Sequence, residues 1–257
     1  ILAAQFSDMQ ERSLLVFDFD GVIVDGMAEY WWSAWHAAQS LDAAPVGLSP
    51  DNVPEAFRCL RPWVHHGWEM VLLAAELSRL QPEAWVAAYD VEQRNALQRR
   101  GWTAVLLQEA LDGVRLRAVQ RDRSAWLQLH RPFPGVPQRL RVLKEEGLDW
   151  AVLTTKSESF TAELLNAFGL EPSRLDGREA GPKPEVLLRL QRERPLRGFV
   201  EDRRATLEAV LRTDGLQALP CFLVDWGYLK PADRTALPAG VRLIDLEQLS
   251  QPLAQWH

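Results

Sequence analysis

Several residue types are scarce in this sequence, and each scarcity excludes a class of protein. Only two of its 257 residues are cysteine, and neither Cys59 nor Cys221 belongs to a CxxC or Cys/His pattern. This spacing gives no disulfide framework and no structural zinc site. A reducing cytoplasm is therefore the compartment that we expect.

Positive charge is also in short supply. The 29 lysines and arginines are outnumbered by 35 aspartates and glutamates, for a formal net charge of -6, and they are scattered through the chain. This balance excludes a nucleic-acid partner. No apolar run approaches the roughly 20 residues that span a bilayer, which excludes a membrane protein. Since the chain begins at Ile1 rather than at methionine, the existence of a removed leader stays open.

What the sequence does have is a large apolar share and much tryptophan. Hydrophobic residues make up 47 % of the chain, enough for a sizeable core in one large domain or two unequal ones. Large aromatic side chains are bulky core fillers, so we interpret the tryptophans as packing between helices. Most of the eleven lie in the first half of the chain: Trp31, Trp32, Trp35, Trp63, Trp68, Trp85, Trp102 and Trp126.

Short apolar runs alternate with helix-like segments along both arms of the chain. Such runs, bounded by polar residues and glycine, are typical of strands buried on both faces. Alternation of strands and helices predicts a Rossmann-like α/β fold, in which a central parallel sheet lies between two layers of helices. The expected strands are 14–17, 150–153, 198–200 and 221–224, and the expected helices are 137–146, 159–168 and 184–191.

The segment 27–129 interrupts this alternation. It contains helix-type patterns, as at 68–80 and 91–100, and no convincing strand pattern. It re-enters the alternating region at HRPFPGV, residues 130–136, whose prolines and glycine are typical of a linker. We therefore expect an all-helical insertion at 27–129 within a core made of 1–26 and 130–257.

The stretch LLVFDFDG, residues 14–21, leads a buried strand directly into two carboxylates. Residues two apart on a strand point the same way, so Asp18 and Asp20 can both project from the carboxyl edge of the sheet, where ligands bind in open α/β folds. Two adjacent carboxylates repel each other unless a cation or a shared proton relieves them. Mg²⁺ prefers oxygen ligands, and Gly21 allows a turn tight enough to bring backbone amides to an anion. Taken alone, the pattern is equally consistent with an Asp-rich turn that caps a helix.

Other polar groups follow the later strands at corresponding points. Thr154 ends the second strand in LTTK, Lys183 lies in GPKP, and Glu201 and Asp202 follow the third strand in VEDRRATL. Because the carboxyl ends of parallel strands share one edge of a sheet, these groups can converge on a single crevice.

With these motifs in order, the sequence resembles the haloacid dehalogenase-like hydrolase superfamily. The family motifs are a strand ending in DxD, a strand ending in Thr or Ser, a lysine, and a strand ending in an acidic pair; here they read FDFDG, LTT, GPKP and VED. The resemblance covers 14–26 and 130–249. It implies a phosphatase-type member with an inserted mobile cap of the all-helical, C1 type.

The resemblance also implies a role for each motif residue. Asp18 would be the nucleophile that forms an aspartyl-phosphate, and Asp20 would be the general acid and then the general base. Lys183 and the Thr154 hydroxyl would hold the phosphoryl oxygens together with Gly21. Asp18, the backbone carbonyl of Asp20 and Asp202 would hold Mg²⁺. Such roles agree with what carboxylates and cations do in phosphoryl transfer.

Some assignments stay open at this point. Thr155 can do the work of Thr154, and either can instead cap the following helix. Glu201 would reach the metal through water. The presence of Asp20 disfavours a dehalogenase, which needs no acid for its leaving group. A sugar-phosphate phosphomutase remains the alternative to a phosphatase, and a non-catalytic ligand-binding or interaction protein is a weaker one.

The insertion offers one guess about specificity. Arg61, His65 and Glu69 are spaced four apart in RPWVHHGWEM, so they would line one face of a helix if Gly67 does not break it, and could read an anionic or hydroxylated substrate. A solvated face with helix-spaced ion pairs is the alternative. The expected partner is a small phosphorylated metabolite, and the expected assembly is a monomer or a homodimer.

Overall fold

The fold was obtained as a computed structural model, which describes residues 12–256. The chain divides into two compact units. The α/β unit combines the residues up to Ile23 with those from Pro132 onward, and the helical unit is Val24–Arg131. Each unit is described by itself.

The α/β unit is built on a six-stranded parallel sheet with the strand order β5-β4-β1-β6-β7-β8. This confirms the predicted α/β class with a central parallel sheet. The first strand lies in the middle because its residues Leu14–Phe17 are fully buried, as a strand covered on both faces requires. The strands are β1 (Ser13–Phe17), β4 (Leu148–Leu153), β5 (Arg174–Asp176), β6 (Leu196–Glu201), β7 (Cys221–Val224) and β8 (Val241–Ile244).

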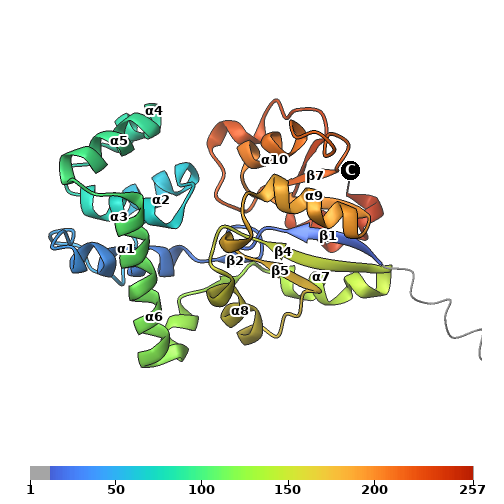
Figure 1. The fold of residues 1–257 in the computed structure, drawn as a ribbon, viewed down its shortest axis with the longest axis horizontal. Helices are drawn as coiled ribbons and strands as arrows, with labels where there is room; N and C mark the ends of the chain where they lie inside the picture. The colour runs from blue at the N-terminus through green and yellow to red at the C-terminus, as the bar shows by residue number, and fades with distance from the viewer. Residues whose placement is uncertain (1–11, 257) are drawn as a thin grey trace, which may run out of the picture. The chain divides into compact units, whose positions relative to one another are not determined.

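Helices cover both faces of this sheet (Figure 1). On one face lie α7 (Val136–Val142) and α8 (Glu158–Ala167), and on the other lie α9 (Lys183–Glu193) and α10 (Arg204–Leu211). The last α-helix of the described residues is α11 (Leu246–Ser250), which packs against α7. Short 3-10 turns join these elements: η2 (Leu143–Glu146), η3 (Arg178–Ala180), η4 (Pro231–Arg234) and η5 (Leu253–Gln255).

The core of this unit is apolar and shared between sheet and helices. Side chains of β1, β4, β6 and β7 pack against side chains of α9 and α10. Val16 and Phe199 from the strands and Leu187 and Leu207 from the helices are all fully buried. Burying a side chain of this size contributes about 1.5–3 kcal/mol relative to exposure. This packing holds the strand ends, and the polar residues that follow them, in fixed positions.

Four of the six strands lie where the sequence predicts them, at β1, β4, β6 and β7. The two that the sequence analysis did not identify are the edge strands. β5 has only three residues, of which Arg174 forms an ion pair with Asp176, and β8 is buried only at its two ends, Val241 and Ile244. Neither contains the continuous apolar run that marks a central strand.

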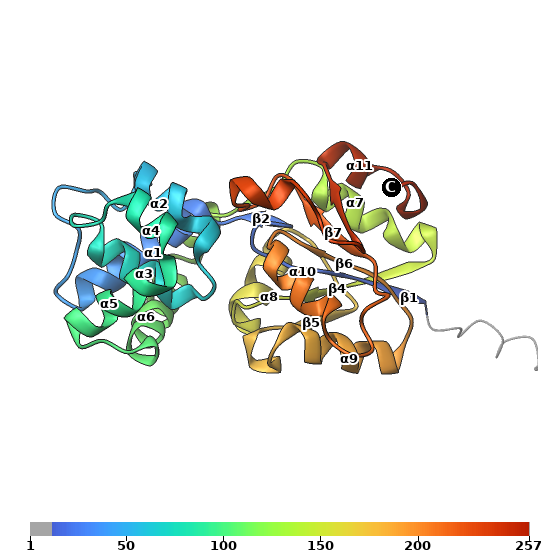
Figure 2. The same cartoon turned by 90° about the horizontal axis from the view of Figure 1, so that it is seen from above.

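The helical unit contains six α-helices and one 3-10 turn, and its chain enters and leaves through a short two-stranded sheet (Figure 2). Its centre is made by α1, α3 and α6, which pack against one another. In chain order the elements are β2 (Val24–Asp25), α1 (Met27–Ser40), α2 (Glu55–Leu60), η1 (Arg61–Trp63), α3 (Gly67–Glu76), α4 (Pro82–Ala87), α5 (Tyr89–Arg100), α6 (Ala104–Gln128) and β3 (Arg131–Pro132). Within residues 12–256, no helix is both long and apolar enough to cross a membrane.

The tryptophans of this unit are only partly core residues. Trp31, Trp85 and Trp126 are buried, and Trp31 also donates its indole N–H to the Ser49 carbonyl at 2.9 Å. The others are half-buried: Trp32, Trp35, Trp63, Trp68 and Trp102. The interpretation of these residues as core packing is confirmed for the first three.

A buried ion pair links α1 to α6. The Arg115 guanidinium donates to both carboxylate oxygens of Glu29 at 2.7 and 2.8 Å, and the side chains are 5 % and 0 % exposed. The Ser33 hydroxyl donates to the same carboxylate. Loss of one partner of such a pair leaves an uncompensated buried charge, which costs about 3–5 kcal/mol.

Candidate active site

The two aspartates of the DxD motif lie at the carboxyl end of β1, in the centre of the sheet. Asp18 directly follows the strand, and its backbone N–H donates to the Val200 carbonyl of the neighbouring β6 at 2.8 Å. The residue is 7 % exposed. Asp20 lies two residues on and its side chain is 17 % exposed. The strand therefore presents one sheltered and one more accessible carboxylate at the same edge.

Lys183 connects Asp18 to Glu201. Its Nζ lies 2.8 Å from Asp18 Oδ1 and 2.7 Å from Glu201 Oε2, and its side chain is 9 % exposed. Burial lowers the pKa of a lysine, but the two carboxylates outweigh this and raise the pKa of Lys183 above its ordinary value. The ammonium group is therefore a fixed positive charge. Lys183 is the first residue of α9, and Pro184 follows it in the first turn of that helix.

Asp18 holds its proton more tightly than an ordinary aspartate. Burial and, after it, the nearby charge of Glu201 raise the pKa of Asp18 from 3.8 to about 7, although Lys183 opposes the shift. The excess of negative charge around this carboxylate is thus only partly relieved by the lysine. A further cation would relieve the rest.

Asp202 and Glu201 complete an acidic group with Asp18. One carboxylate oxygen from each residue lies within 4.8 Å of the other two, and all three residues are buried. Burial raises the pKa of Glu201 as well, against the attraction of Lys183. Glu201 Oε2 accepts from Lys183, and Oε1 accepts from the backbone N–H groups of Asp202 and Arg203 at 3.2 Å. Glu201 thus uses both oxygens within the protein, whereas Asp18 Oδ1 accepts no hydrogen bond of good geometry from the residues that the structure describes.

This donor set fits a hard divalent cation. Mg²⁺ takes oxygen ligands and is usually held by one or two carboxylates plus waters. Three buried carboxylates, each with one oxygen within 4.8 Å of the other two, are a set that such an ion would satisfy. Asp18, Glu201 and Asp202 are therefore the carboxylates that could hold a metal ion at this edge of the sheet.

Two glycines allow the backbone to approach Asp202 closely. Gly21 has φ of +86°, and a Cβ there would lie 2.0 Å from Asp202 Oδ2. A Cβ on Gly227 would lie 2.4 Å from the Asp202 Cβ and 2.5 Å from the Gly21 carbonyl. The next backbone N–H, that of Tyr228, donates to Asp202 Oδ2 at 2.9 Å. Gly21 is predicted from the sequence, whereas the contribution of Gly227 and Tyr228 is not. The available signal for these two residues is the WGY sequence after β7.

Thr154 and Thr155 occupy different environments. Thr154 is 3 % exposed, and its Oγ1 accepts from the backbone N–H of Lys156 at 3.1 Å. Its own N–H donates to the Asp176 carbonyl at 3.0 Å, which ties the end of β4 to β5. Thr155 is exposed. Of the two hydroxyls, that of Thr154 is the one held in a sheltered position at the carboxyl edge.

Lys156 is a buried residue at this edge that the sequence analysis did not assign. Its Nζ lies 3.4 Å from Asp20 Oδ2, and its side chain is 2 % exposed. The available signal was its place in LTTK, two residues beyond Thr154. The DxD aspartates thus each have a lysine: Lys183 beside Asp18, and Lys156 beside Asp20.

The expected arrangement of Arg61, His65 and Glu69 on one helix face is wrong. Arg61 lies in η1, His65 lies in the following loop, and the helix begins only at Gly67 because His66 has an extended backbone and caps it. The Arg61 guanidinium instead lies over the Tyr30 ring, 4.9 Å from its centroid.

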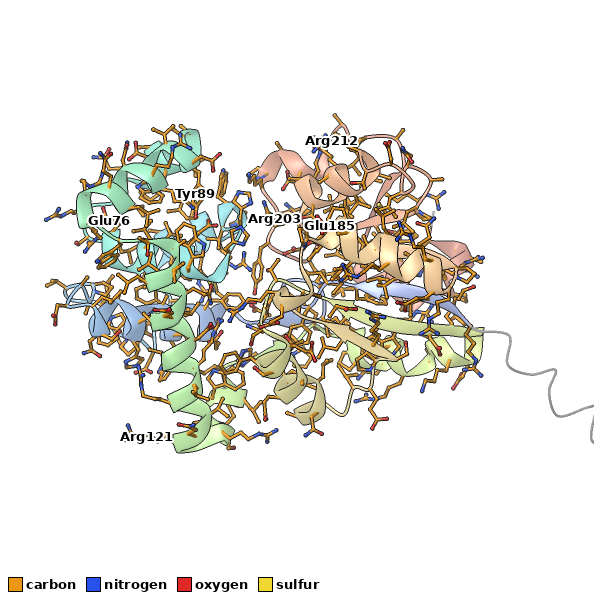
Figure 3. All side chains as sticks on the ribbon, in the orientation of Figure 1. Glu76, Tyr89, Arg121, Glu185, Arg203 and Arg212 are labelled. Carbon is orange, nitrogen blue, oxygen red and sulfur yellow. The ribbon has the colours of Figure 1, made fainter. Side chains whose placement is uncertain are left out.

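Glu69 is buried inside the helical unit. Its carboxylate accepts from the backbone N–H groups of His65 and His66 at 3.1 and 2.9 Å, and from the Tyr89 hydroxyl at 2.9 Å (Tyr89 is labelled in Figure 3). Burial raises the pKa of Glu69, and these hydrogen bonds oppose the shift. Glu69 is 1 % exposed and caps the start of α3. The specificity role given to the three residues stays a prediction.

A separate cavity of about 920 Å³ lies in the helical unit between α1 and α6. It is lined mainly by apolar and aromatic groups, among them Trp32, His36 and Trp126, together with Arg117 and Arg121 (Arg121 is labelled in Figure 3). Arg61, His65 and Glu69 are not among its lining residues.

Comparison with known proteins identifies the family of the chain. Residues 13–194 match the model of the haloacid dehalogenase-like hydrolase family, which is more than half of the chain. The chain belongs to this family of hydrolases. None of the curated proteins compared with it is similar enough in sequence to count as a relative.

Solved structures share the fold at low sequence identity. A predicted phosphoglycolate phosphatase from Haemophilus somnus 129pt is 18 % identical, with a TM-score of 0.62 over 94 % of this chain and 97 % of that one. A predicted phosphatase from Clostridium acetobutylicum is 16 % identical, with a TM-score of 0.60 over 93 % and 96 %. A candidate β-phosphoglucomutase from Thermotoga maritima is 15 % identical, with a TM-score of 0.56 over 93 % and 96 %.

Proposed function

We propose that this hydrolase is a Mg²⁺-dependent phosphatase that cleaves the phosphate ester of a small metabolite through an aspartyl-phosphate on Asp18. The observation that carries the proposal is the buried lysine Lys183, 2.8 Å from Asp18 Oδ1, beside the acidic group that includes Asp202. A carboxylate, a fixed ammonium and oxygen ligands for a cation are what transfer of a phosphoryl group to an aspartate requires.

Asp18 is the nucleophile in this mechanism. One of its oxygens attacks phosphorus, and the alcohol departs as the aspartyl-phosphate forms. Lys183 and the Thr154 hydroxyl hold the phosphoryl oxygens and neutralise their charge, which is the largest contribution to catalysis of this kind. Glu201 holds Lys183 at 2.7 Å and so fixes the ammonium in place.

Asp20 is the acid and base. It gives a proton to the leaving alcohol, and in the second half of the reaction it takes a proton from the water that attacks the aspartyl-phosphate. Its greater exposure compared with Asp18 suits a group that must meet both the alcohol and the water.

Mg²⁺ would be held by Asp18, Asp202 and the backbone carbonyl of Asp20, with Glu201 acting through water or through Lys183. When bound, it neutralises the phosphoryl oxygens and favours the ionised form of Asp18. The charges of the site support a divalent ion. Four carboxylates, at Asp18, Asp20, Glu201 and Asp202, lie at this edge with two buried lysines, Lys156 and Lys183, so acidic groups outnumber the lysines.

The helical unit Val24–Arg131 is proposed as the cap that limits access of water and selects the substrate. Its insertion directly after the DxD motif supports this role, because the chain leaves the α/β unit at Ile23. The names of the structural neighbours, two of them phosphatases, are consistent with a phosphorylated small molecule as substrate.

The test is a panel of phosphorylated metabolites assayed for released phosphate with and without Mg²⁺. Wild type is expected to hydrolyse at least one of them only with Mg²⁺, and Asp18→Asn to lose the activity. Asp214→Asn, an exposed aspartate, is the matched control and should behave as wild type. Unchanged phosphate release by Asp18→Asn would overturn the proposal. Isomerised product without released phosphate, on addition of a sugar bisphosphate, would identify a phosphomutase instead.

A further inference from the structure

Lys156 is a buried lysine at the carboxyl edge of the sheet. The residue is 5 % exposed and lies between the end of β4 and the N-cap Ser157 of α8. Lysine is almost never fully buried unless it is paired, because removing an ammonium from water is costly. An apolar side chain of similar volume would avoid that cost. The retained charge therefore indicates a function.

One partner of that charge is the carboxylate of Asp20. Lys156 Nζ lies 3.4 Å from Asp20 Oδ2, and β1 and β4 are neighbouring parallel strands, with Phe17 paired to Val152. The segments that follow the two strands thus leave the sheet side by side. The ion pair joins these segments across the edge of the sheet.

The backbone of Lys156 is held on both sides. Its N–H donates to Thr154 Oγ1 at 3.1 Å, and its carbonyl accepts from the backbone N–H of Arg178 at 2.9 Å. The side chain thus extends from a fixed point. A lysine with a fixed backbone can hold the Asp20 carboxylate in one position, although a turn directly follows Asp20.

We propose that Lys156 is a positioning residue for the acid–base carboxylate Asp20, which it orients toward the leaving-group oxygen through the ion pair between β1 and β4. This inference rests on the proposed phosphatase function and assigns a residue that the family motifs in this chain leave without a role. Lys156 acts on the reaction only through Asp20. Misplacement of a reacting group by about 1 Å can cost on the order of a hundredfold in rate.

The test uses the dependence of the rate on the leaving group. A good leaving group, such as a nitrophenol, departs without a proton, whereas a poor one, such as an alkyl alcohol, needs the general acid. The value of kcat/KM reports on the step in which the alcohol leaves, so it is measured with Mg²⁺ for a series of aryl and alkyl phosphates. Lys156→Met removes the charge and keeps most of the volume.

A role through Asp20 predicts a graded loss. Lys156→Met should lose a few-fold in kcat/KM with the best leaving group and about 100-fold with the worst, and Asp20→Asn should show the same trend more strongly. The double variant should be no slower than Asp20→Asn alone, since the lysine has no other route to the reaction. Lys156→Arg, which keeps the charge, should recover part of the activity that Lys156→Met loses with the poorest leaving groups. Lys144→Met, at an exposed lysine, should leave the series unchanged.

Three results would overturn the inference. An equal loss for all leaving groups, a rise in KM alone, or additive losses in the double variant would each mean that Lys156 acts on the substrate or on folding. Unfolding curves for each variant identify a loss of structure, and Lys156→Gln replaces Lys156→Met if the latter does not fold. If wild type hydrolyses the series in an Asp18-dependent way, but kcat/KM of Lys156→Met depends on the leaving group as in wild type, only the inference about Lys156 fails. If wild type hydrolyses none of the series, the proposed function fails with it.

Discussion

The buried carboxylate of Asp18 predicts that removing its charge stabilises the metal-free protein. Asp18 is 7 % exposed, and burial together with the charge of Glu201 raises its pKa from 3.8 to about 7. Asn has nearly the same shape and never ionises. The variant Asp18→Asn therefore removes the cost of the buried negative charge while it keeps the packing.

The sign and size of the effect follow from linkage. Because the pKa of Asp18 is higher in the folded state, that state binds the proton more tightly, and the resulting stability is fully present below about pH 4 and lost as the pH rises to about 7. The difference between 3.8 and about 7 corresponds to on the order of 4 kcal/mol. Asp18→Asn should match wild type near pH 4 and exceed its free energy of unfolding by up to about 4 kcal/mol near pH 8.

The assay is urea unfolding followed by tryptophan fluorescence, with a chelator present, at several pH values between about 4 and 8. Asp214→Asn, at an exposed aspartate, is the control and should differ little from wild type at any pH. Adding Mg²⁺ should stabilise wild type more than Asp18→Asn, because binding to the folded state alone raises stability. A stability difference that does not change with pH would refute the account of Asp18 as a buried, poorly compensated charge.

Three further predictions concern the surroundings of the site. Gly227→Ala should weaken Mn²⁺ or Mg²⁺ binding at least tenfold, measured by calorimetry, because the new Cβ would lie 2.4 Å from the Asp202 Cβ and displace that ligand. Lys183→Met should lower the free energy of unfolding by about 3–5 kcal/mol in denaturant titrations, because it leaves two buried carboxylates without their cation. Of the two thiols, exposed Cys59 should react with an aromatic disulfide reagent in the folded protein, whereas Cys221, whose pKa burial raises to about 12, should react only on unfolding.

Each of these has a control or a contradicting result. Gly113→Ala adds a Cβ that meets only the end of the flexible Arg117 side chain, so cation binding should not change. A metal affinity of Gly227→Ala equal to wild type would mean that Asp202 is not a ligand. Lys144→Met, at an exposed lysine, should leave the unfolding curve where it is. Equal reaction rates for both thiols would contradict the burial of Cys221.

The central strands and the residues that follow them could be predicted from the sequence, because both depend on local patterns. The run Leu14–Phe17 is apolar throughout, as a strand buried on both faces must be, and Asp18 follows it directly. The edge strands were missed because they carry mixed residues. In β5, the half-buried Arg174 pairs with the buried Asp176, which no apolar pattern reveals.

The missed site residues depend on contacts between distant segments. In the sequence, nothing distinguishes Lys156 from other loop lysines. Only the pairing of β1 with β4 brings it close to Asp20. Gly227 is required only because Asp202 and Gly21 crowd the same space from other parts of the chain. In both cases the sequence separation between the partners exceeds the range of any local pattern.

In the helical unit, a local sequence pattern led to a wrong prediction. The four-residue spacing of Arg61, His65 and Glu69 suggested a shared helix face, but the extended backbone of His66 starts a new helix at Gly67. Glu69 then folds back to accept the N–H groups of His65 and His66. Glu69 thus caps the start of α3 and is buried, instead of lying on an exposed helix face.

The most direct test of the account is to trap the phosphorylated enzyme. Wild type is mixed with a substrate found in the metabolite panel and Mg²⁺, quenched in acid within one turnover, and digested for mass spectrometry. We expect one phosphoryl group on the peptide that contains Asp18, labile to hydroxylamine as an acyl phosphate is, and none in Asp18→Asn. Substrate turnover with no phosphoryl group on that peptide, or with the group on another residue, would contradict the assignment of Asp18 as nucleophile.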